Sequence, residues 1–203
     1  MIEPLVRVQS RAAVLPDANI DTDIIFPARF LLLIDRDGLK ECLFADRRFD
    51  ADGKENPDFP LNQDGLRDAR ILLTGPGFGC GSSREQAVWA LVDNDIRIVI
   101  GTDFGDIFAG NATKNGLLLV RLDEQTHRDL VAKAEAGAVI AVDLPSRRVS
   151  SDGEAICDFE LSDSALEAYV NGWDETDIVL NTELPHVVAF EEIHRRRQPW
   201  LFA

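Results

Sequence analysis

The stretch GPGFGCGSSREQAVWAL, residues 75–91, has glycine at four alternate positions, then polar side chains, and then a helix-like apolar pattern. Glycine permits positive φ angles and close approach to the backbone, which a loop needs when its amide groups converge on an anion. Apolar runs typical of buried strands lie before the loop, at residues 69–74, and after the helix pattern, at residues 96–100. The order strand, glycine loop, helix, strand predicts a crossover unit of an α/β fold.

The polar end of the loop supports two interpretations. In the first, Ser82 or Ser83 only caps a helix over residues 83–92. Glu85 is then a first-turn acid that suits the helix dipole, and Arg84 is an ordinary surface residue. In the second, the loop amides, the hydroxyls and the guanidinium together form an anion site at the start of a helix. A cap requires one polar residue and no run of glycines, so the combination favours the second interpretation.

Three known motifs do not match this loop. A dinucleotide-binding GxGxxG fingerprint would need glycine where Cys80 or Ser82 stands. The Gly-Lys-Ser/Thr of a P-loop is absent from the stretch, and Glu85 replaces the last glycine of a GxSxG nucleophile elbow. The predicted site therefore binds an anion smaller than a nucleotide, or uses a serine that no local histidine activates.

The composition excludes several classes of protein. The chain of 203 residues is 45% hydrophobic and carries a net charge of −15, which argues against a nucleic-acid partner. Apolar runs stay well below the roughly 20 residues that span a bilayer, and the first residues lack a signal-peptide pattern, so we expect neither membrane insertion nor export. The widely spaced Cys42, Cys80 and Cys157 predict no disulfide framework and no metal site in this chain. A reducing cytoplasm is the expected location.

The rest of the chain extends the alternation of strands and helices. We expect one domain over residues 1–203, in which residues from about 160 onward form a helical C-terminal extension, and a surface excursion at residues 47–68. The further predicted strands are residues 6–15, 117–120 and 139–142 with a hairpin at 147–161, and the further predicted helices are residues 38–44, 106–112, 124–136, 164–170, capped by Asp163, and 187–197.

A second dense polar cluster is NIDTDII, residues 19–25, ahead of Pro27. One interpretation is an Asx-rich turn whose acids are solvated. The other follows from the isoleucines that alternate with the acids, because they place at least one acid toward the interior. A buried aspartate needs a cationic partner such as Arg84 or Arg36 to stay charged.

Together, NIDTDIIFPARFL and FGCGSSREQAVWAL resemble the small subunit of 3-isopropylmalate dehydratase, in the aconitase superfamily. The resemblance continues through PDFPLN at residues 57–62 and DFGDIFAGNATKNGLLLV at residues 103–120, and covers most of the chain. It implies an α/β fold, the swivelling β/β/α domain of that superfamily, here with additional C-terminal helices. Such a domain closes over an active site on a separate large subunit. The resemblance also implies a [4Fe-4S] cluster on that large subunit, whose open iron binds the substrate, and no cofactor in this chain.

The implied activity is that of a hydro-lyase which works only with its large subunit. It interconverts 2-isopropylmalate and 3-isopropylmalate, small dicarboxylates, by dehydration and rehydration in leucine biosynthesis. Gln86 and Val88 stand where the family often has His and Pro. One alternative is therefore a small subunit acting on another malate-type acid, of the homoaconitase, citraconate (2-methylmalate) or dimethylmalate type. A non-catalytic, anion-binding swivelling domain is a further alternative.

The resemblance also assigns roles to individual residues. Ser82 matches the position that removes a proton from carbon as an alkoxide, and Ser83 and Arg84 match binders of a substrate carboxylate. Asp23 matches an acid that supports the site. The remaining assignments are Arg36 as a second carboxylate contact, Leu32 at a position where the family adjusts substrate choice, and Gly79 and Gly81 as supporting residues.

Overall fold

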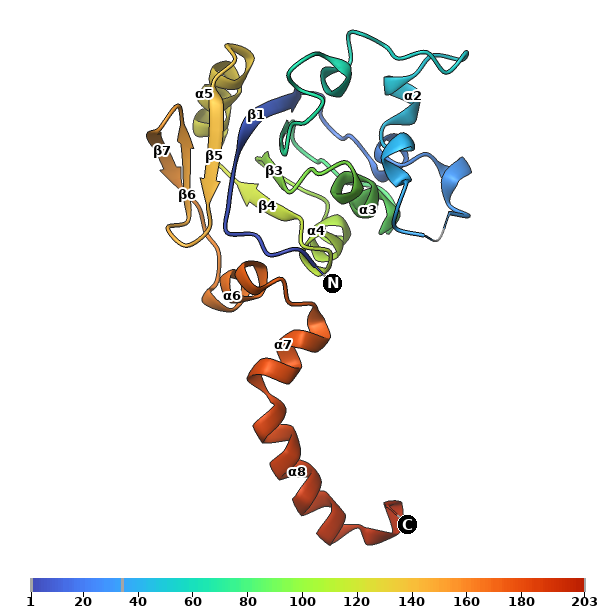
Figure 1. Ribbon diagram of the computed structural model, residues 1–203, viewed down its shortest axis with the longest axis vertical. Coiled ribbons are helices and arrows are strands. Elements are labelled where there is room, and N and C mark those ends of the chain that lie inside the picture. The colour runs from blue at the N-terminus through green and yellow to red at the C-terminus, as the bar shows by residue number, and fades with distance from the viewer. Residues whose placement is uncertain (1, 34, 203) are drawn as a thin grey trace.

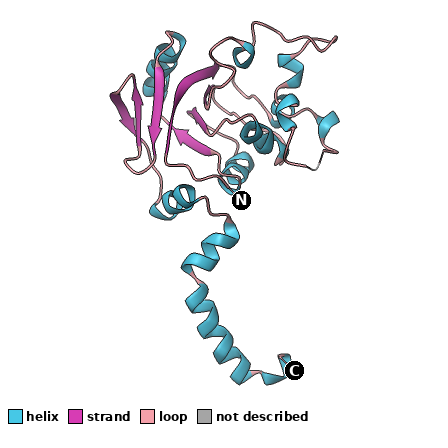
Figure 2. Ribbon diagram, viewed as in Figure 1, coloured by secondary structure: helices cyan, strands magenta, loops and turns pink. Residues whose placement is uncertain are grey.

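The computed structural model describes residues 2–33 and 35–202 and has a curled, seven-stranded sheet at its centre (Figures 1 and 2). The strand order is β4-β3-β2-β1-β5-β6-β7, and the predicted α/β fold class is confirmed. The strands are β1 (Arg7–Leu15), β2 (Ile71–Thr74), β3 (Ile98–Gly101), β4 (Leu118–Arg121), β5 (Val139–Asp143), β6 (Arg148–Ser151) and β7 (Glu154–Asp158).

Eight α-helices and four short 3-10 helices join these strands in the described part of the chain. The α-helices are α1 (Thr22–Ile25), α2 (Ala45–Arg48), α3 (Gln86–Asp93), α4 (Asp106–Lys114), α5 (Glu124–Glu135), α6 (Asp163–Asn171), α7 (Glu175–Thr182) and α8 (Leu184–Arg197). The 3-10 helices are η1 (Ala28–Phe30), η2 (Leu39–Glu41), η3 (Pro60–Asn62) and η4 (Pro199–Leu201).

Strand β1 joins the two halves of the sheet. Its first part pairs antiparallel with β5, in the register of Val8 opposite Val142. Its last part pairs parallel with β2, in the register of Ala12 opposite Ile71. Because β1 and β2 are parallel, their carboxyl ends meet at one edge of the sheet, and the loops that follow them start side by side. Strands β3 and β4 extend this parallel half.

Alternating side chains of the parallel strands build two separate cores. Leu72 points to the core that contains Val88 of α3, and Ile71 points to the opposite core, which contains Leu130 of α5. All four side chains are fully buried. Because these strands are buried on both faces, their sequences are continuous apolar runs, which is typical of parallel strands. Helices α3 and α4 cover one face and α5 the other (Figure 1).

The expectation of a surface excursion at residues 47–68 was only partly right. Phe59 and Leu61 are buried, and the ring of Phe59 lies 5.6 Å from that of Phe44. The buried Asn62 carboxamide accepts a hydrogen bond from Arg48 Nε at 3.1 Å and donates one to the Arg48 carbonyl at 2.8 Å. The few apolar residues of this polar segment therefore anchor it to the core at isolated points, which composition alone does not reveal.

The structure differs from the sequence expectations for three helices. The helix expected at residues 38–44 is wrong: η2 covers only Leu39–Glu41, and α2 begins after Phe44, whose left-handed backbone interrupts the helical path. Helix α3 begins at Gln86, three residues later than expected, because the chain before it is held in the glycine loop. Helix α6 is capped by Ser162, whose hydroxyl accepts from the Ala165 amide, and the expected cap Asp163 pairs instead with Arg147.

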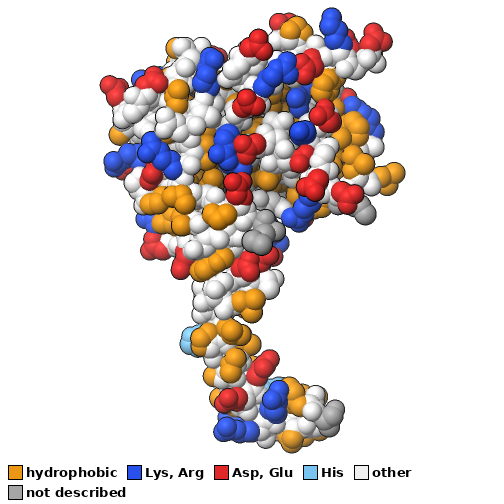
Figure 3. Space-filling model, in the orientation of Figure 1, with side chains coloured by type: hydrophobic (Ala, Val, Ile, Leu, Met, Phe, Trp, Pro, Cys, Tyr) orange, Lys and Arg blue, Asp and Glu red, His pale blue; other side chains and the backbone are white. Residues whose placement is uncertain are grey.

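The C-terminal helices begin on the body of the protein and then leave it (Figure 1). Tyr169 of α6 is buried and donates a hydrogen bond to the Leu117 carbonyl at 3.1 Å, and burial raises the pKa of its phenol to about 12. Apolar side chains are exposed along the two helices that follow (Figure 3): Val179, Leu180, Leu184, Val187, Val188, Phe190 and Ile193. In the part of the chain that the structure describes, no helix has the length and hydropathy to cross a membrane.

One partly buried histidine is expected to make the stability of the fold depend on pH. Burial lowers the pKa of His127 on α5, so the folded chain disfavours its charged form. A histidine with a lowered folded pKa destabilises the protein as pH falls through the ordinary value of about 6.5, because the unfolded chain then binds more protons. We expect the thermal midpoint to fall between about pH 7.5 and about pH 5.5, and His127→Gln to reduce that fall.

The matched control is His186→Gln on the exposed face of α8, which we expect to keep the pH dependence of the parent chain. Thermal melts followed by circular dichroism measure both variants. Identical pH dependence in the parent and in His127→Gln would contradict the prediction.

Candidate active site

The two polar motifs found in the sequence lie against each other at the carboxyl edge of β1 and β2. Their backbones are joined by a hydrogen bond from the Gly79 amide to the Ile20 carbonyl at 2.8 Å, and by one from the Thr22 amide to the Cys80 carbonyl at 3.0 Å. The first motif thus lies directly against the second and supports it, although about sixty residues separate them.

The glycines of the loop are required by conformation and by packing. Gly79 has φ +75°, and a Cβ at this position would overlap the ring of Phe108. That ring packs edge-on against Phe78 at 5.4 Å between centroids. Gly81 has φ +92°, and its backbone lies so close to Asp21 that a Cβ would stand 3.3 Å from the Cβ of the aspartate. A larger residue at Gly79 would therefore displace Phe108, and one at Gly81 would press against the first motif.

Ser82 is exposed on the loop, and its hydroxyl lies within hydrogen-bond distance of a buried residue of the first motif. Its Oγ is 2.8 Å from the Oγ1 of Thr22, and that same Oγ1 is 3.3 Å from the Ser82 carbonyl oxygen. The Thr22 residue is only 1% exposed. We did not single out Thr22 from the sequence; the available signal was its place between the alternating isoleucines and acids of the NIDTDII motif.

The two acids of the first motif have different tasks. Asp21 caps α1 by accepting a hydrogen bond from the Ile24 amide at 2.8 Å. Asp23 forms an ion pair with the guanidinium of Arg84, whose side chain is only 18% exposed. Asp21 thus makes an Asx-type cap, and Asp23 has the expected arginine partner. The expectation of a buried aspartate is wrong, because the Asp23 side chain is 54% exposed and it is Arg84 that is mostly buried.

The interpretation of the serines as caps of α3 is wrong. Ser82 and Ser83 lie in the loop before the helix, and Glu85 occupies the N-cap position without a side-chain capping bond. The Glu85 carboxylate instead accepts from Asn115 Nδ2 at 2.7 Å, and Asn115 Oδ1 accepts from Trp89 Nε1 at 3.1 Å. Asn115, from the DFGDIFAGNATKNG motif, thereby fixes the start of α3 behind the site. Its role was not predicted.

Within the described residues, Arg36 and Leu32 have no substrate-like partner. The Arg36 guanidinium lies 4.8 Å from the ring centroid of Trp89 and lines a polar groove with Asp37 and Asp93. Leu32 is 92% exposed. Their contacts with a substrate stay predictions.

Metal ligands do not gather in the described ranges, since residues 2–33 and 35–202 contain no group of three His, Cys, Asp or Glu side chains placed to hold an ion. Cys42 is buried, and Cys80 and Cys157 are partly buried, all as free thiols. Burial raises the pKa of the Cys42 and Cys157 thiols.

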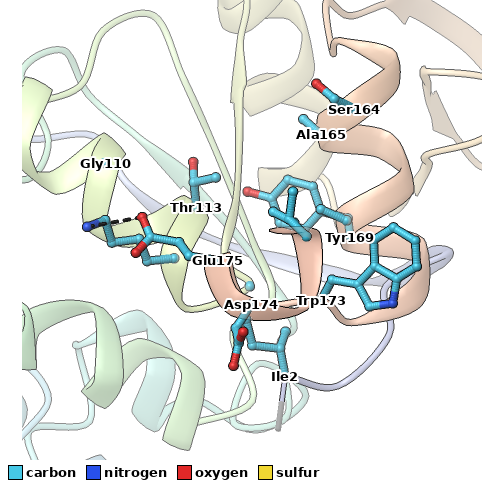
Figure 4. A pocket seen from close by; sticks show the side chains of 13 residues that line it. Ile2, Gly110, Thr113, Ser164, Ala165, Tyr169, Trp173, Asp174 and Glu175 are labelled. Atoms are coloured by element: carbon cyan, nitrogen blue, oxygen red, sulfur yellow. Dashed lines mark ion pairs between the residues drawn. The ribbon is translucent and has the colours of Figure 1, made fainter. Parts of the chain in front are cut away.

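An apolar pocket of about 470 Å³ lies elsewhere, where α6 and α7 meet α4 (Figure 4). Tyr169 and Trp173 form its wall, and the ion pair of Lys114 with Glu175, 3.2 Å between Nζ and Oε1, lies at its edge. Residues 82–84 do not belong to its lining. This pocket is therefore separate from the candidate active site, whose Asp21 and Asp23 line another cavity together with Ile24 and Arg29.

The curled mixed sheet and the glycine loop that ends β2 define a domain of the aconitase superfamily. Residues 2–125 match the family model of the aconitase C-terminal domain. The chain is 46% identical over 192 residues to the 3-isopropylmalate dehydratase small subunit of Rhodospirillum centenum, an alignment that covers 93% of this chain and 94% of the relative. It is 41% identical to the small subunit from Afipia carboxidovorans, over 98% of this chain and all of the relative. The chain belongs to the family of 3-isopropylmalate dehydratase small subunits.

A solved structure supports the fold. The crystal structure of 3-isopropylmalate dehydratase from Methanocaldococcus jannaschii superposes with a TM-score of 0.64 at 22% sequence identity, over 90% of this chain and 99% of that one. At this identity the likeness concerns the fold alone, and it confirms the expected swivelling-domain architecture.

The packing around Gly79 leads to a stability prediction. We expect Gly79→Ala to lower the free energy of unfolding by about 2 to 5 kcal/mol, because it adds left-handed strain and overpacks Phe108. Gly110→Ala in α4 is the control, since a Cβ there meets nothing within 4 Å; it should stabilise the helix by about 0.5 to 1 kcal/mol. Urea unfolding measures both, and equal effects of the two substitutions would refute the packing argument.

Proposed function

We propose that this chain supplies the serine half of the active site of a two-subunit 3-isopropylmalate dehydratase, a hydro-lyase of leucine biosynthesis. The observation that carries the proposal is the exposed Ser82 hydroxyl beside Arg84, on a chain that is 46% identical over 192 residues to such a subunit. Small subunits for other malate-type acids are not favoured, because the similar relatives are named for isopropylmalate. A non-catalytic domain is not favoured either, since the serine and the arginine are both present.

Ser82 acts as the base that removes a proton from the substrate carbon next to a carboxylate. Dehydration removes this proton together with the hydroxyl group of 2-isopropylmalate, and rehydration of the alkene in the other orientation gives 3-isopropylmalate. A serine hydroxyl has an unperturbed pKa far above neutrality, so the alkoxide requires strong local stabilisation. The exposed position on a loop held by backbone hydrogen bonds suits a group that meets its substrate on the surface of this domain.

Ser83 and Arg84 bind a substrate carboxylate beside the base. The ion pair with Asp23 uses Nη1 of Arg84, and the guanidinium has further N–H donors in a fixed plane. Asp23 therefore orients the guanidinium and leaves donors free for a carboxylate, which is the support that the sequence resemblance implies for this acid. Arg36 provides a second carboxylate contact once the partner subunit is in place.

The partner is the larger subunit, which the name of the related small subunits implies. It would carry a [4Fe-4S] cluster, which would supply a Lewis acid for the substrate hydroxyl. In this proposal the dicarboxylate lies between the two subunits. Residues 1–203 form one swivelling domain in which residues from about 160 onward are a helical extension, and the complex works in the cytoplasm.

We expect the isolated chain to be inactive and to gain isopropylmalate dehydratase activity when mixed, without air, with a cluster-loaded large subunit. Ser82→Ala should abolish turnover and leave the complex assembled, because the base is lost while the loop backbone is kept. Absorbance of the alkene intermediate follows the reaction, and size-exclusion chromatography follows assembly. Ser164→Ala, on the exposed start of α6, is the control. Preserved turnover in Ser82→Ala would remove this serine from the base role.

Leu32 provides a test of substrate choice. Its exposed isobutyl side chain suits an isopropyl group better than a third carboxylate. We expect Leu32→Arg to lower kcat/KM for 2-isopropylmalate by about 10- to 100-fold, a loss typical of a missing apolar contact, and to leave assembly intact. Steady-state kinetics with 2-isopropylmalate and a tricarboxylic analogue measure the change. An unchanged ratio between the two substrates would place Leu32 outside the specificity surface.

A further inference from the structure

We propose that Thr22 is a positioning residue for the reaction: its buried hydroxyl donates a hydrogen bond to Ser82 Oγ and holds this atom as the proton acceptor. The inference rests on the proposed role of Ser82. The Oγ1 of Thr22 lies 2.8 Å from Ser82 Oγ, which is a normal distance for a hydrogen bond between hydroxyl groups.

A hydroxyl has one proton, and Thr22 has two acceptors within reach: Ser82 Oγ at 2.8 Å and the Ser82 carbonyl oxygen at 3.3 Å. While Ser82 is protonated, it donates to Thr22, and Thr22 donates to the carbonyl. When Ser82 is an alkoxide, it has no proton to donate. The Thr22 proton then points to the alkoxide after a rotation about the Cβ–Oγ1 bond, and no heavy atom has to move.

The surroundings of Thr22 keep its hydroxyl in place before the reaction. The residue is 1% exposed, and its amide donates to the Cys80 carbonyl at 3.0 Å. Its carbonyl accepts from the Phe26 amide at 2.9 Å, which closes α1. A β-branched side chain in a fixed backbone has few accessible rotamers. The donor is therefore preorganised, and preorganised donors contribute most to stabilising a developing charge.

Thr22 and its neighbour Asp23 have different functions, which one side chain could not provide together. Asp23 pairs with Arg84 and so serves carboxylate binding, whereas Thr22 serves the base. A neutral hydroxyl stabilises the alkoxide without protonating it, and it adds no charge that would compete for the substrate carboxylate.

The test compares three variants of the full chain in the assembled two-subunit enzyme. Thr22→Val keeps the shape and removes the hydroxyl, Thr22→Ser keeps the hydroxyl, and Thr74→Val makes the same exchange at another threonine that is 1% exposed. Among the residues that the structure describes, the Thr74 hydroxyl is buried without a hydrogen-bond partner, so it is a matched control. We expect kcat to fall about 10- to 100-fold in Thr22→Val, as for the loss of a hydrogen bond to a charged group, with KM within about twofold.

In the same assay Thr22→Ser should recover kcat to within about threefold of the parent enzyme, and Thr74→Val should match the parent. Should Thr22→Val not fold, Thr22→Ala is compared with Thr22→Ser in its place. A kcat within about twofold of the parent in the variant without the hydroxyl overturns the inference, and so does an equal loss in Thr22→Ser.

A second readout needs no turnover and no large subunit. Ser82→Cys places a titratable thiol at the position of the base, and a hydroxyl that donates to it lowers its pKa. We expect the pH of half-maximal alkylation of this thiol to rise when Thr22→Val is added and to stay unchanged when Thr74→Val is added. The parent chain, treated in parallel, subtracts the reaction of Cys42, Cys80 and Cys157. If Thr22→Val leaves the pH of half-maximal alkylation unchanged, the inference is overturned.

The outcomes separate this inference from the proposed function. Full turnover in Ser82→Ala refutes the role of Ser82, and the inference about its partner falls with it. An inactive Ser82→Ala together with an unaffected Thr22→Val refutes only the role of Thr22.

Discussion

The site depends on the backbone hydrogen bonds that join the first polar motif to the glycine loop. Gly79 donates to Ile20 and Thr22 donates to Cys80, so two segments that are distant in sequence form one hydrogen-bonded unit. The Thr22 hydroxyl reaches Ser82, and Asp23 reaches Arg84, because these hydrogen bonds fix the position of one segment relative to the other. Loops on a surface are usually mobile, and here the paired backbones take the place of a regular strand pair.

The sheet topology creates the opportunity for this pairing. Strands β1 and β2 are parallel neighbours, so their carboxyl ends lie at the same edge, and the loop after each strand contains one of the two motifs. The long connection that parallel neighbours require runs through α1, α2 and the segment anchored by Asn62. The antiparallel half, β5 to β7, pairs with the other part of β1 and leaves this edge free.

The sequence allowed much of this architecture to be predicted, and the failures have physical reasons. Apolar runs and the glycine loop predicted the crossover around β2 and β3, because burial on both faces leaves a strong signal. The start of α3 was misplaced because a cap depends on backbone geometry, and the loop imposes positive φ at Gly79 and Gly81.

Within the candidate site, the residue types were predictable and their partners were not. The pattern could not tell which of Asp21 and Asp23 faces Arg84, since both alternate with isoleucine. Thr22 was overlooked for the same reason: a threonine between two acids has no distinctive signal until the fold places a serine above it. Only the meeting of two loops from adjacent strands defines these pairs.

The exposure of the proposed base is consistent with a divided active site. In water an alkoxide at Ser82 is unfavourable, because bulk solvent protonates it and screens the donors around it. Once a larger subunit covers the loop, the same donors act in a low dielectric, where their interaction with a developing charge is stronger. In the proposed two-subunit enzyme, this chain holds Thr22 and Arg84 beside an exposed Ser82 hydroxyl, and the larger subunit completes the site.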